Sequence, residues 1–226
     1  MSAAGEADIT LVAGSSGSGK SAFVKRAIAG RKRVIAWDPT DEYSAAGFVR
    51  CYSLTDLVAR LKRAERARIA YVAREMADFD LWCRIAYRWG NCTVVAEELA
   101  DVTSPGKAPP GWGRVLRRGR HRGLSVFGIT QRPCESDKTI VGNRTAVHIC
   151  RLERVADRAY MARETGLTLE QVSELRPPPA LDYIHVERGK VESGSLKFPP
   201  KTGQKPLKGA IPKSQKRGEY APLKPA

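Results

Sequence analysis

The sequence has few of the features that mark membrane-spanning, secreted or zinc-binding proteins. No apolar run approaches the roughly 18 to 20 residues that cross a bilayer, and the first ten residues, MSAAGEADIT, lack the basic-then-apolar layout of a signal peptide. The five cysteines are scattered, with no CxxC pair, and the three histidines show no metal-ligand spacing. This pattern disfavours a disulfide framework or a zinc site, and it predicts a soluble intracellular protein with reduced thiols.

Acidic residues are scarce relative to basic ones. The 226 residues include 24 Asp and Glu against 39 Lys and Arg, a formal net charge of +15. A positive field of this size favours a polyanionic partner, with nucleic acid first and an anionic membrane surface second. Because many basic proteins bind no polyanion, composition supports this interpretation without deciding it.

What the sequence does contain is a phosphate-binding loop. Residues 14–21 read GSSGSGKS and match the pattern G-x-x-x-x-G-K-[S/T] at every fixed position. A strand is predicted before the loop, over residues 8–13, and a helix after it, over 22–29, so backbone N–H groups and the helix dipole would face an anion. A chance Gly/Ser-rich turn is the alternative, and the flanking elements disfavour it. We therefore predict that ATP binds the whole loop: Gly14, Ser15, Ser16, Gly17, Ser18, Gly19, Lys20 and Ser21.

Two residues of this loop have individual chemical roles in the prediction. Lys20 would reach the β- and γ-phosphates of ATP, and the Ser21 hydroxyl would ligate Mg²⁺. The predicted cofactors are therefore ATP and Mg²⁺.

Apolar runs and amphipathic segments alternate along most of the chain. Further strands are predicted over residues 33–37, 48–52, 68–72, 91–96, 124–130, 145–150 and 181–187, and further helices after Ser53 and over 76–89, 112–120, 153–164 and 169–175. This alternation predicts an α/β fold with a mostly parallel central sheet flanked by helices.

The chain is expected to have one folded domain and one tail. We assign residues 1–188 to the ATPase domain. Residues 189–226 are rich in Pro, Gly and Lys, and their eight lysines and one arginine against two glutamates give a net charge of +7. Such a segment cannot bury enough apolar surface to fold alone, so a disordered basic tail is predicted.

An apolar strand ending in two acids follows the phosphate loop in the sequence. Residues 93–98 read TVVAEE, the Walker B arrangement, in which the first acid holds the Mg²⁺ shell and the second polarises the attacking water as general base. Glu97 is thus the metal candidate and Glu98 the catalytic one. Glu97 stands where Asp is usual, which leaves open whether it contacts the metal directly. Two glutamates that merely begin a loop are the alternative.

The strand predicted over 124–130 ends at Gln131. A neutral amide at a strand tip can sense the γ-phosphate or position the lytic water without adding a charge. A surface glutamine is the equally open alternative on the residue alone.

The phosphate loop, residues 38–43, the paired acids and the strand that ends at Gln131 follow one another along the chain, and in this order they resemble the motifs of the FtsK/HerA-type DNA-pumping ATPases. Residues 120–133, RHRGLSVFGITQRP, are similar to the sensor segment that ends in a TQRP-like tetrapeptide, and residues 38–43, DPTDEY, are similar to the D-P-x-x-E-Y stretch of HerA-like members. The resemblance covers roughly residues 8–150. Within this superfamily, the small size looks most like the genome-packaging ATPases of tailless, membrane-containing phages of tectivirus type.

The resemblance implies a fold, partners and a location. The fold would be a RecA-like (ASCE) P-loop ATPase core that assembles as a homo-oligomeric ring, expected to be a hexamer, and drives double-stranded DNA into a preformed capsid. A capsid-vertex or internal-membrane protein would be the docking partner. The protein would lie in the host cytoplasm or at the packaging vertex of the virion, or peripherally on a membrane.

A ring ATPase also implies an arginine that reaches the neighbouring subunit's γ-phosphate. Arg118 is our choice within the cluster Arg114, Arg117, Arg118, Arg120 and Arg122, whose other members could contact DNA phosphates. Arg144, in GNRTAVHI, resembles the N-x-R position of FtsK-like proteins and is the second candidate. For any single arginine, a solvated basic face is the alternative.

Three other functions use the same loop. A Zot-like assembly and export ATPase of filamentous phages shares the RHRG…TQ layout but normally carries a transmembrane segment. A small-molecule P-loop kinase would have an arginine-rich lid and a substrate pocket. A non-hydrolysing binding module would not need Glu98.

Overall fold

The computed structural model describes residues 8–196 and arranges their strands in one nine-stranded sheet, in the order β3-β4-β2-β5-β6-β1-β7-β8-β9. The strands are β1 (Asp8–Ala13), β2 (Arg33–Trp37), β3 (Val49–Cys51), β4 (Ala67–Tyr71), β5 (Thr93–Ala96), β6 (Ser125–Thr130), β7 (Ala146–Cys150), β8 (Asp182–Glu187) and β9 (Lys190–Ser195). All pairings from β3 to β7 are parallel, and β8 and β9 add an antiparallel hairpin. The predicted α/β class is confirmed.

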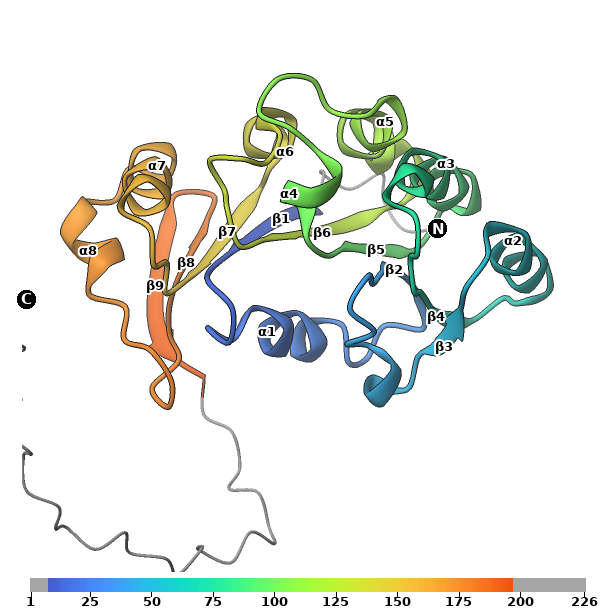
Figure 1. Ribbon diagram of the computed structural model, residues 1–226, viewed down its shortest axis with the longest axis horizontal. Helices are drawn as coiled ribbons and strands as arrows, with labels where there is room; N and C mark the ends of the chain where they lie inside the picture. The colour runs from blue at the N-terminus through green and yellow to red at the C-terminus, as the bar shows by residue number, and fades with distance from the viewer. Residues whose placement is uncertain (1–7, 197–226) are drawn as a thin grey trace, which may run out of the picture.

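Helices cover both faces of this sheet (Figure 1). They are α1 (Lys20–Ala27), α2 (Leu54–Arg63), α3 (Phe79–Trp89), α4 (Leu99–Val102), α5 (Pro110–Arg118), α6 (Lys138–Asn143), α7 (Val155–Thr165) and α8 (Leu169–Ser173), with short 3₁₀ turns η1 (Ser44–Ala46), η2 (Met76–Asp78) and η3 (Gly119–Arg122). Helix α1 lies on one face, and α3, α5 and α6 lie on the other. Helices α2 and α8 have side-chain N-caps, since Ser53 and Thr168 accept from the backbone amides of Asp56 and Gln171.

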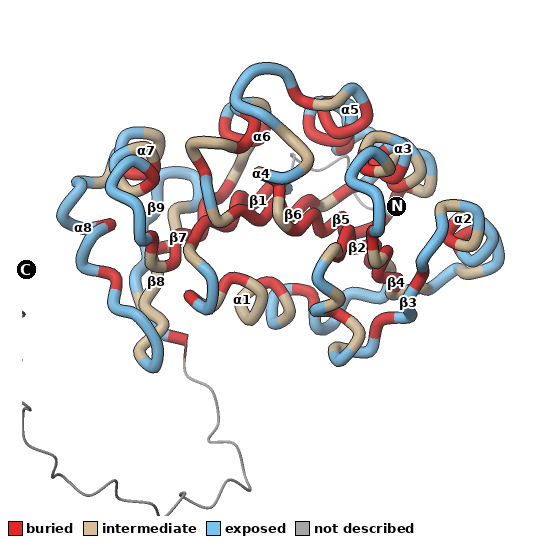
Figure 2. Tube along the Cα trace, in the orientation of Figure 1, coloured by how far each residue is buried: buried red, intermediate tan, exposed pale blue. Residues whose placement is uncertain are grey.

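The central strands are buried on both faces, which is why they read as continuous apolar runs. Alternate residues of β1 separate into two cores: Ile9 and Leu11 pack with α3 and α5, and Val12 packs with α1. Figure 2 shows the buried positions concentrated along β1, β6, β5 and β2. The aromatic stripe of α3 belongs to this core, where Trp82 packs edge-on against Trp37.

The predicted end of the folded domain at residue 188 is wrong. Residues 190–195 form β9, which pairs with β8 from Glu187↔Lys190 to Asp182↔Ser195. Strand β9 reads KVESGS and is mostly exposed, so its apolar content does not mark it as a strand, and only pairing at the sheet edge makes it one. The rest of the predicted tail, residues 197–226, lies outside the described residues.

The short helices α4 and α6 were also not predicted, because each has only four to six residues. In the part of the chain that the structure describes, no helix combines the length and the apolar character that a membrane crossing requires.

Candidate functional site: a nucleotide pocket at the ends of the parallel strands

The site lies at the edge of the sheet where β1, β2, β5 and β6 end. In the parallel register, Ala13 of β1 is level with Thr130 of β6, and Ala96 of β5 is level with Gly128 of β6 and with Trp37 of β2. The segments that follow these strands, although distant in sequence, therefore emerge side by side. A cavity of about 290 Å³ forms there, lined by Ser16, Gly17, Gly19, Lys20, Ser21, Ala22, Glu42, Glu97, Glu98, Gln131 and Leu181.

The phosphate loop is anchored to the strands beside it. The Gly14 amide donates to the Thr130 carbonyl (3.2 Å), and the Ser15 amide donates to the Arg151 carbonyl (2.8 Å). A Cβ on Gly14 would lie 2.7 Å from Cβ of Cys150, so only glycine allows the loop to approach β7 this closely. Gly14 and Ser15 thus hold the loop in place, Ser18 is buried beside them, and the other five residues of the predicted set line the cavity.

Lys20 is held inside the loop at the start of α1. Its side chain is buried, and its Nζ donates to the Ser15 carbonyl at 2.9 Å. Burial lowers the pKa of Lys20 below its ordinary value, and the carboxylates of Glu98 and Glu97 act in the opposite direction. Gly19, the residue before it, has φ 105°, a left-handed conformation that favours glycine. The loop therefore presents a cation and the amino end of α1 to the cavity, which is the geometry that binds phosphate.

Glu98 and Gln131 form a direct pair across the cavity. The Gln131 amide donates from Nε2 to Oε1 of Glu98 at 2.6 Å. Strand β6 lies between β5 and β1, so the residue after β6 sits between the acids and the phosphate loop. The pair leaves the second carboxylate oxygen of Glu98 without a partner among the described residues, and this oxygen is available to accept a proton.

Glu97 belongs to a buried network that the sequence interpretation did not identify. It is 3% exposed, and its Oε1 accepts a hydrogen bond from the Tyr43 hydroxyl at 2.6 Å. Tyr43 is held by Asp38, whose carboxylate accepts from the backbone amides of Glu42 (2.8 Å) and Tyr43 (2.9 Å). The D-P-x-x-E-Y stretch thus acts as a turn that delivers a hydroxyl to the first acid of the adjacent strand.

Burial changes the protonation of Glu97. The pKa of Glu97 is raised to about 7, chiefly by loss of solvation and further by the nearby carboxylates of Glu42 and Glu98. The hydrogen bond from Tyr43 and the charge of Lys20 act in the opposite direction. A bound Mg²⁺ would favour the ionised form of this carboxyl, since metal ligands must be deprotonated.

The side chains present fit a nucleotide-bound Mg²⁺. Ser21 and Glu97 line the same cavity as Lys20, and Mg²⁺ in such sites takes one or two protein ligands, with phosphate and water completing the octahedron. Across residues 8–196 no group of three or more His, Cys, Asp and Glu side chains is placed to hold a metal by itself. These residues would therefore share the ion with the nucleotide.

The Mg²⁺ requirement should depend on pH through Glu97, and Tyr43→Phe should shift that dependence. Below about pH 7 the protonated fraction of Glu97 grows, so the Mg²⁺ concentration for half-maximal ATP hydrolysis should rise, by at most about tenfold per pH unit. The variant removes a hydrogen bond that lowers the pKa of Glu97, so the rise should begin at higher pH. Mg²⁺ titrations of hydrolysis on both sides of pH 7 measure this.

Tyr52→Phe is the matched control for that experiment, because Tyr52 is 50% exposed and does not line the nucleotide cavity. Superimposable profiles for Tyr43→Phe and the wild type would show that the tyrosine does not tune the metal ligand.

Neither arginine-finger candidate lies at the nucleotide cavity of its own chain. The Arg144 guanidinium donates to the carbonyls of Val141 and Glu164, just before the start of β7 and thus at the opposite edge of the sheet. Arg118 is exposed at the end of α5 and lines a separate cavity with Lys107, Arg114 and Arg117. A role for either in a neighbouring subunit stays a prediction, and Arg144 would first have to release its own carbonyl partners.

The hairpin β8–β9 contributes a wall that sequence reasoning also missed. The Leu196 amide donates to the Leu181 carbonyl at 3.1 Å. A Cβ added to Gly19 would lie 3.1 Å from Leu196 and 3.6 Å from Leu181. Two leucines thus cover the outside of the phosphate loop, and no local pattern in the sequence signals this contact.

This site and this sheet define a P-loop NTPase: a glycine loop after a central strand, two acids at the end of a strand two positions away, and a polar residue at the end of the strand between them.

Comparison with known proteins gives the same class. No protein-family model matches the sequence. Among solved structures, the genome packaging NTPase B204 of Sulfolobus turreted icosahedral virus 2, bound to ATP-γS, superposes with a TM-score of 0.70 at 17% identity, covering 84% of this chain and 98% of B204.

A second neighbour, VirB4 of Thermoanaerobacter pseudethanolicus, superposes with a TM-score of 0.61 at 11% identity and covers 85% of this chain and 90% of VirB4. At these identities the structures show a shared fold. In sequence, the chain is 31% identical over 175 residues to protein P9 of Pseudoalteromonas phage PM2, which covers 75% of this chain and 80% of P9. The chain belongs to the family of protein P9, and the P-loop NTPase class that the motif order predicted is confirmed.

Proposed function

We propose that this protein hydrolyses ATP to translocate double-stranded DNA, as the motor that packages a viral genome into a preformed capsid. The observation that carries the hydrolytic part is the Glu98–Gln131 pair, which places a partly exposed carboxylate opposite Lys20 in one cavity. The viral part is supported by kinship with a phage protein and by the fold shared with B204, described as a genome packaging NTPase.

Each residue of the cavity then has a role in hydrolysis. Lys20 and the amides of the phosphate loop bind the β- and γ-phosphates, and Ser21 and Glu97 would hold Mg²⁺, which would neutralise phosphate charge. Glu98 accepts a proton from water as the water oxygen bonds to the γ-phosphorus and the bond from that phosphorus to the β–γ bridging oxygen breaks. Gln131 keeps the carboxylate of Glu98 oriented and contributes a neutral donor beside the reacting phosphate.

A homo-oligomeric assembly would supply the arginine that neither candidate places at the nucleotide cavity of its own chain. Arg118 and Arg144 lie away from the cavity, so a homo-oligomeric ring would be needed for either to act as a finger on a neighbour's ATP. The net charge of +15 suits a duplex partner. We propose a capsid-vertex or internal-membrane protein as the docking partner, with residues 197–226 as the basic tail that follows the ATPase domain.

Steady-state ATP hydrolysis with and without linear duplex DNA tests this function, with Lys20→Ala as the blank. Stimulation of the wild type by duplex, stronger than by single strands of the same length, is the expected result. Stronger stimulation by single strands would instead favour a Zot-like export ATPase. Turnover indifferent to DNA, and switched on by a small nucleotide acceptor, would favour a kinase.

A further inference from the structure

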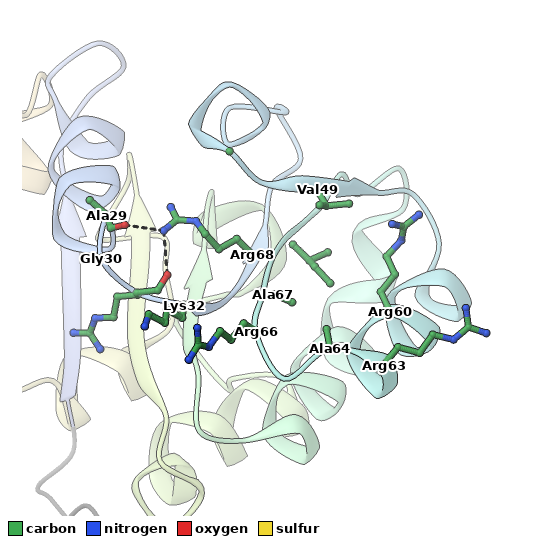
Figure 3. A pocket seen from close by; sticks show the side chains of 13 residues that line it. Ala29, Gly30, Lys32, Val49, Arg60, Arg63, Ala64, Arg66, Ala67 and Arg68 are labelled. Atoms are coloured by element: carbon green, nitrogen blue, oxygen red, sulfur yellow. Dashed lines mark hydrogen bonds between the residues drawn. The ribbon is translucent and has the colours of Figure 1, made fainter.

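A second cavity, of about 730 Å³ and strongly basic, lies away from the nucleotide site. Its walls come from the α1–β2 connection, the end of α2 and the connection from α2 into β4, as Figure 3 shows. Six of its lining residues are cations: Arg31, Lys32, Arg60, Arg63, Arg66 and Arg68. No acidic residue lines it, so the charged side chains that face the cavity are all positive.

This basic cavity lies at the opposite edge of the sheet from the nucleotide cavity. Lys32 immediately precedes β2 and Arg66 immediately precedes β4, and these two strands are parallel to each other and to the strands that carry the nucleotide site. The phosphate loop and the two acids follow the other ends of those strands. A strand of five residues separates the two edges by roughly 15 Å, so the cavity is a distinct site.

Arg68 sets the shape of the cavity. It donates from Nη1 to the carbonyls of Ile28 (2.9 Å), Ala29 (3.1 Å) and Arg31 (3.1 Å), and its guanidinium stacks over the Phe48 ring at 4.6 Å. The bond to Ala29 is visible in Figure 3. Arg68 therefore fixes the α1–β2 connection, and the wall that carries Lys32 is in place before any ligand arrives.

Three of the six cations are free to bind a ligand. Arg31 bonds to Ser125 and Asp8, and Arg60 pairs with Asp56. Lys32, Arg63 and Arg66 are exposed, and none of their side chains has a hydrogen bond or ion pair with any other residue in the range 8–196. Exposed cations without acidic partners, gathered around one cavity, are the side chains that neutralise phosphate groups.

We propose that this basic cavity binds the sugar-phosphate backbone of double-stranded DNA. Its lining contains no aromatic ring on which an unpaired base could stack. It also contains no amide, hydroxyl or carboxylate side chain. Arginine and lysine can read guanine in the major groove as well as bind phosphate, and we assign these cations to the phosphates, a contact independent of sequence that suits a motor that must move along any duplex. The identification of the polyanion as duplex DNA rests on the proposed function. The presence of the cavity and its positive charge do not depend on that function.

The test is a triple neutralisation, Lys32→Gln, Arg63→Gln and Arg66→Gln, against a matched control triple, Arg88→Gln, Lys138→Gln and Lys190→Gln. Both sets replace exposed residues whose charged side-chain groups have no hydrogen bond or ion pair among the described residues, and both lower the net charge from +15 by three, to +12. Duplex binding is measured as a function of salt for two unrelated sequences, without nucleotide. The cavity triple should bind about tenfold or more weakly at low salt, and the slope of log K against log salt should fall by about two to three. The control should change little.

Three outcomes separate the possibilities. If the cavity triple binds like the control triple while the wild type binds duplex, the inference is wrong and the proposed function stands. If the wild type hydrolyses ATP but binds no duplex, the proposed function fails and the DNA assignment of the cavity fails with it. If the cavity triple keeps duplex binding but loses binding to vesicles of phosphatidylglycerol, the cavity serves an anionic membrane and the inference is overturned. The three single variants, each expected to lower the slope by about one, give the same answer if the triple variant melts early.

Discussion

Changing Glu98 to Gln should lower the rate of ATP hydrolysis by about 10²- to 10⁴-fold, the usual contribution of a general base, and leave nucleotide affinity close to that of the wild type. The replacement keeps the side-chain volume, and its amide oxygen can still accept from Gln131, as the Glu98 carboxylate does at 2.6 Å. The replacement removes the negative charge of the carboxylate and, with it, the ability to take a proton from water. Phosphate release and equilibrium binding of a fluorescent ATP analogue, measured side by side, separate the two effects.

Glu170→Gln is the matched control, because Glu170 is an exposed acid in the first turn of α8 and lies outside the nucleotide cavity. Wild-type turnover in Glu98→Gln would refute the general-base assignment. Glu97→Gln would then be the next variant to measure, since Glu97 is the other acid at the end of β5.

Changing Lys20 to Ala should weaken ATP binding by about 10- to 150-fold, which corresponds to the roughly 1.5 to 3 kcal/mol of one hydrogen bond to a charged group. Hydrolysis should fall below detection, because the same cation stabilises the charge that develops on the transferred phosphate. The loss of the bond from Lys20 to the Ser15 carbonyl also loosens the loop itself. Titration calorimetry with ATP and Mg²⁺ measures the affinity.

Arg26→Ala removes a cation from the same helix at an exposed position and should bind ATP like the wild type. Equal affinities for Lys20→Ala and Arg26→Ala would mean that the loop does not bind the triphosphate through its lysine.

The phosphate loop and its flanking elements were predictable because their signals are local. An apolar run, a glycine loop and a helix follow one another within residues 8–27, and each requires only its own neighbours to form. The same holds for the strand that ends in Glu97 and for the helix caps at Ser53 and Thr168. The order of these motifs was sufficient to predict the α/β class and the P-loop NTPase fold.

What the sequence could not provide is which strand lies beside which. Tyr43 bonds to Glu97 across 54 positions of the chain and Gln131 bonds to Glu98 across 33, and both contacts exist only because the order β2-β5-β6-β1 brings those strand ends together. No pattern near Tyr43 indicates that its hydroxyl would be buried against a carboxyl.

The sequence by itself therefore determined the chemistry: the phosphate loop, the paired acids, and the excess of positive charge. The tertiary structure decided the placement. Strand β9 is a strand only because the edge of β8 accepts it, and the basic cavity exists only because β2 and β4 are neighbours. The physical reason is that local elements form from short-range propensity, whereas the pairing of parallel strands depends on long-range burial summed over the whole sheet.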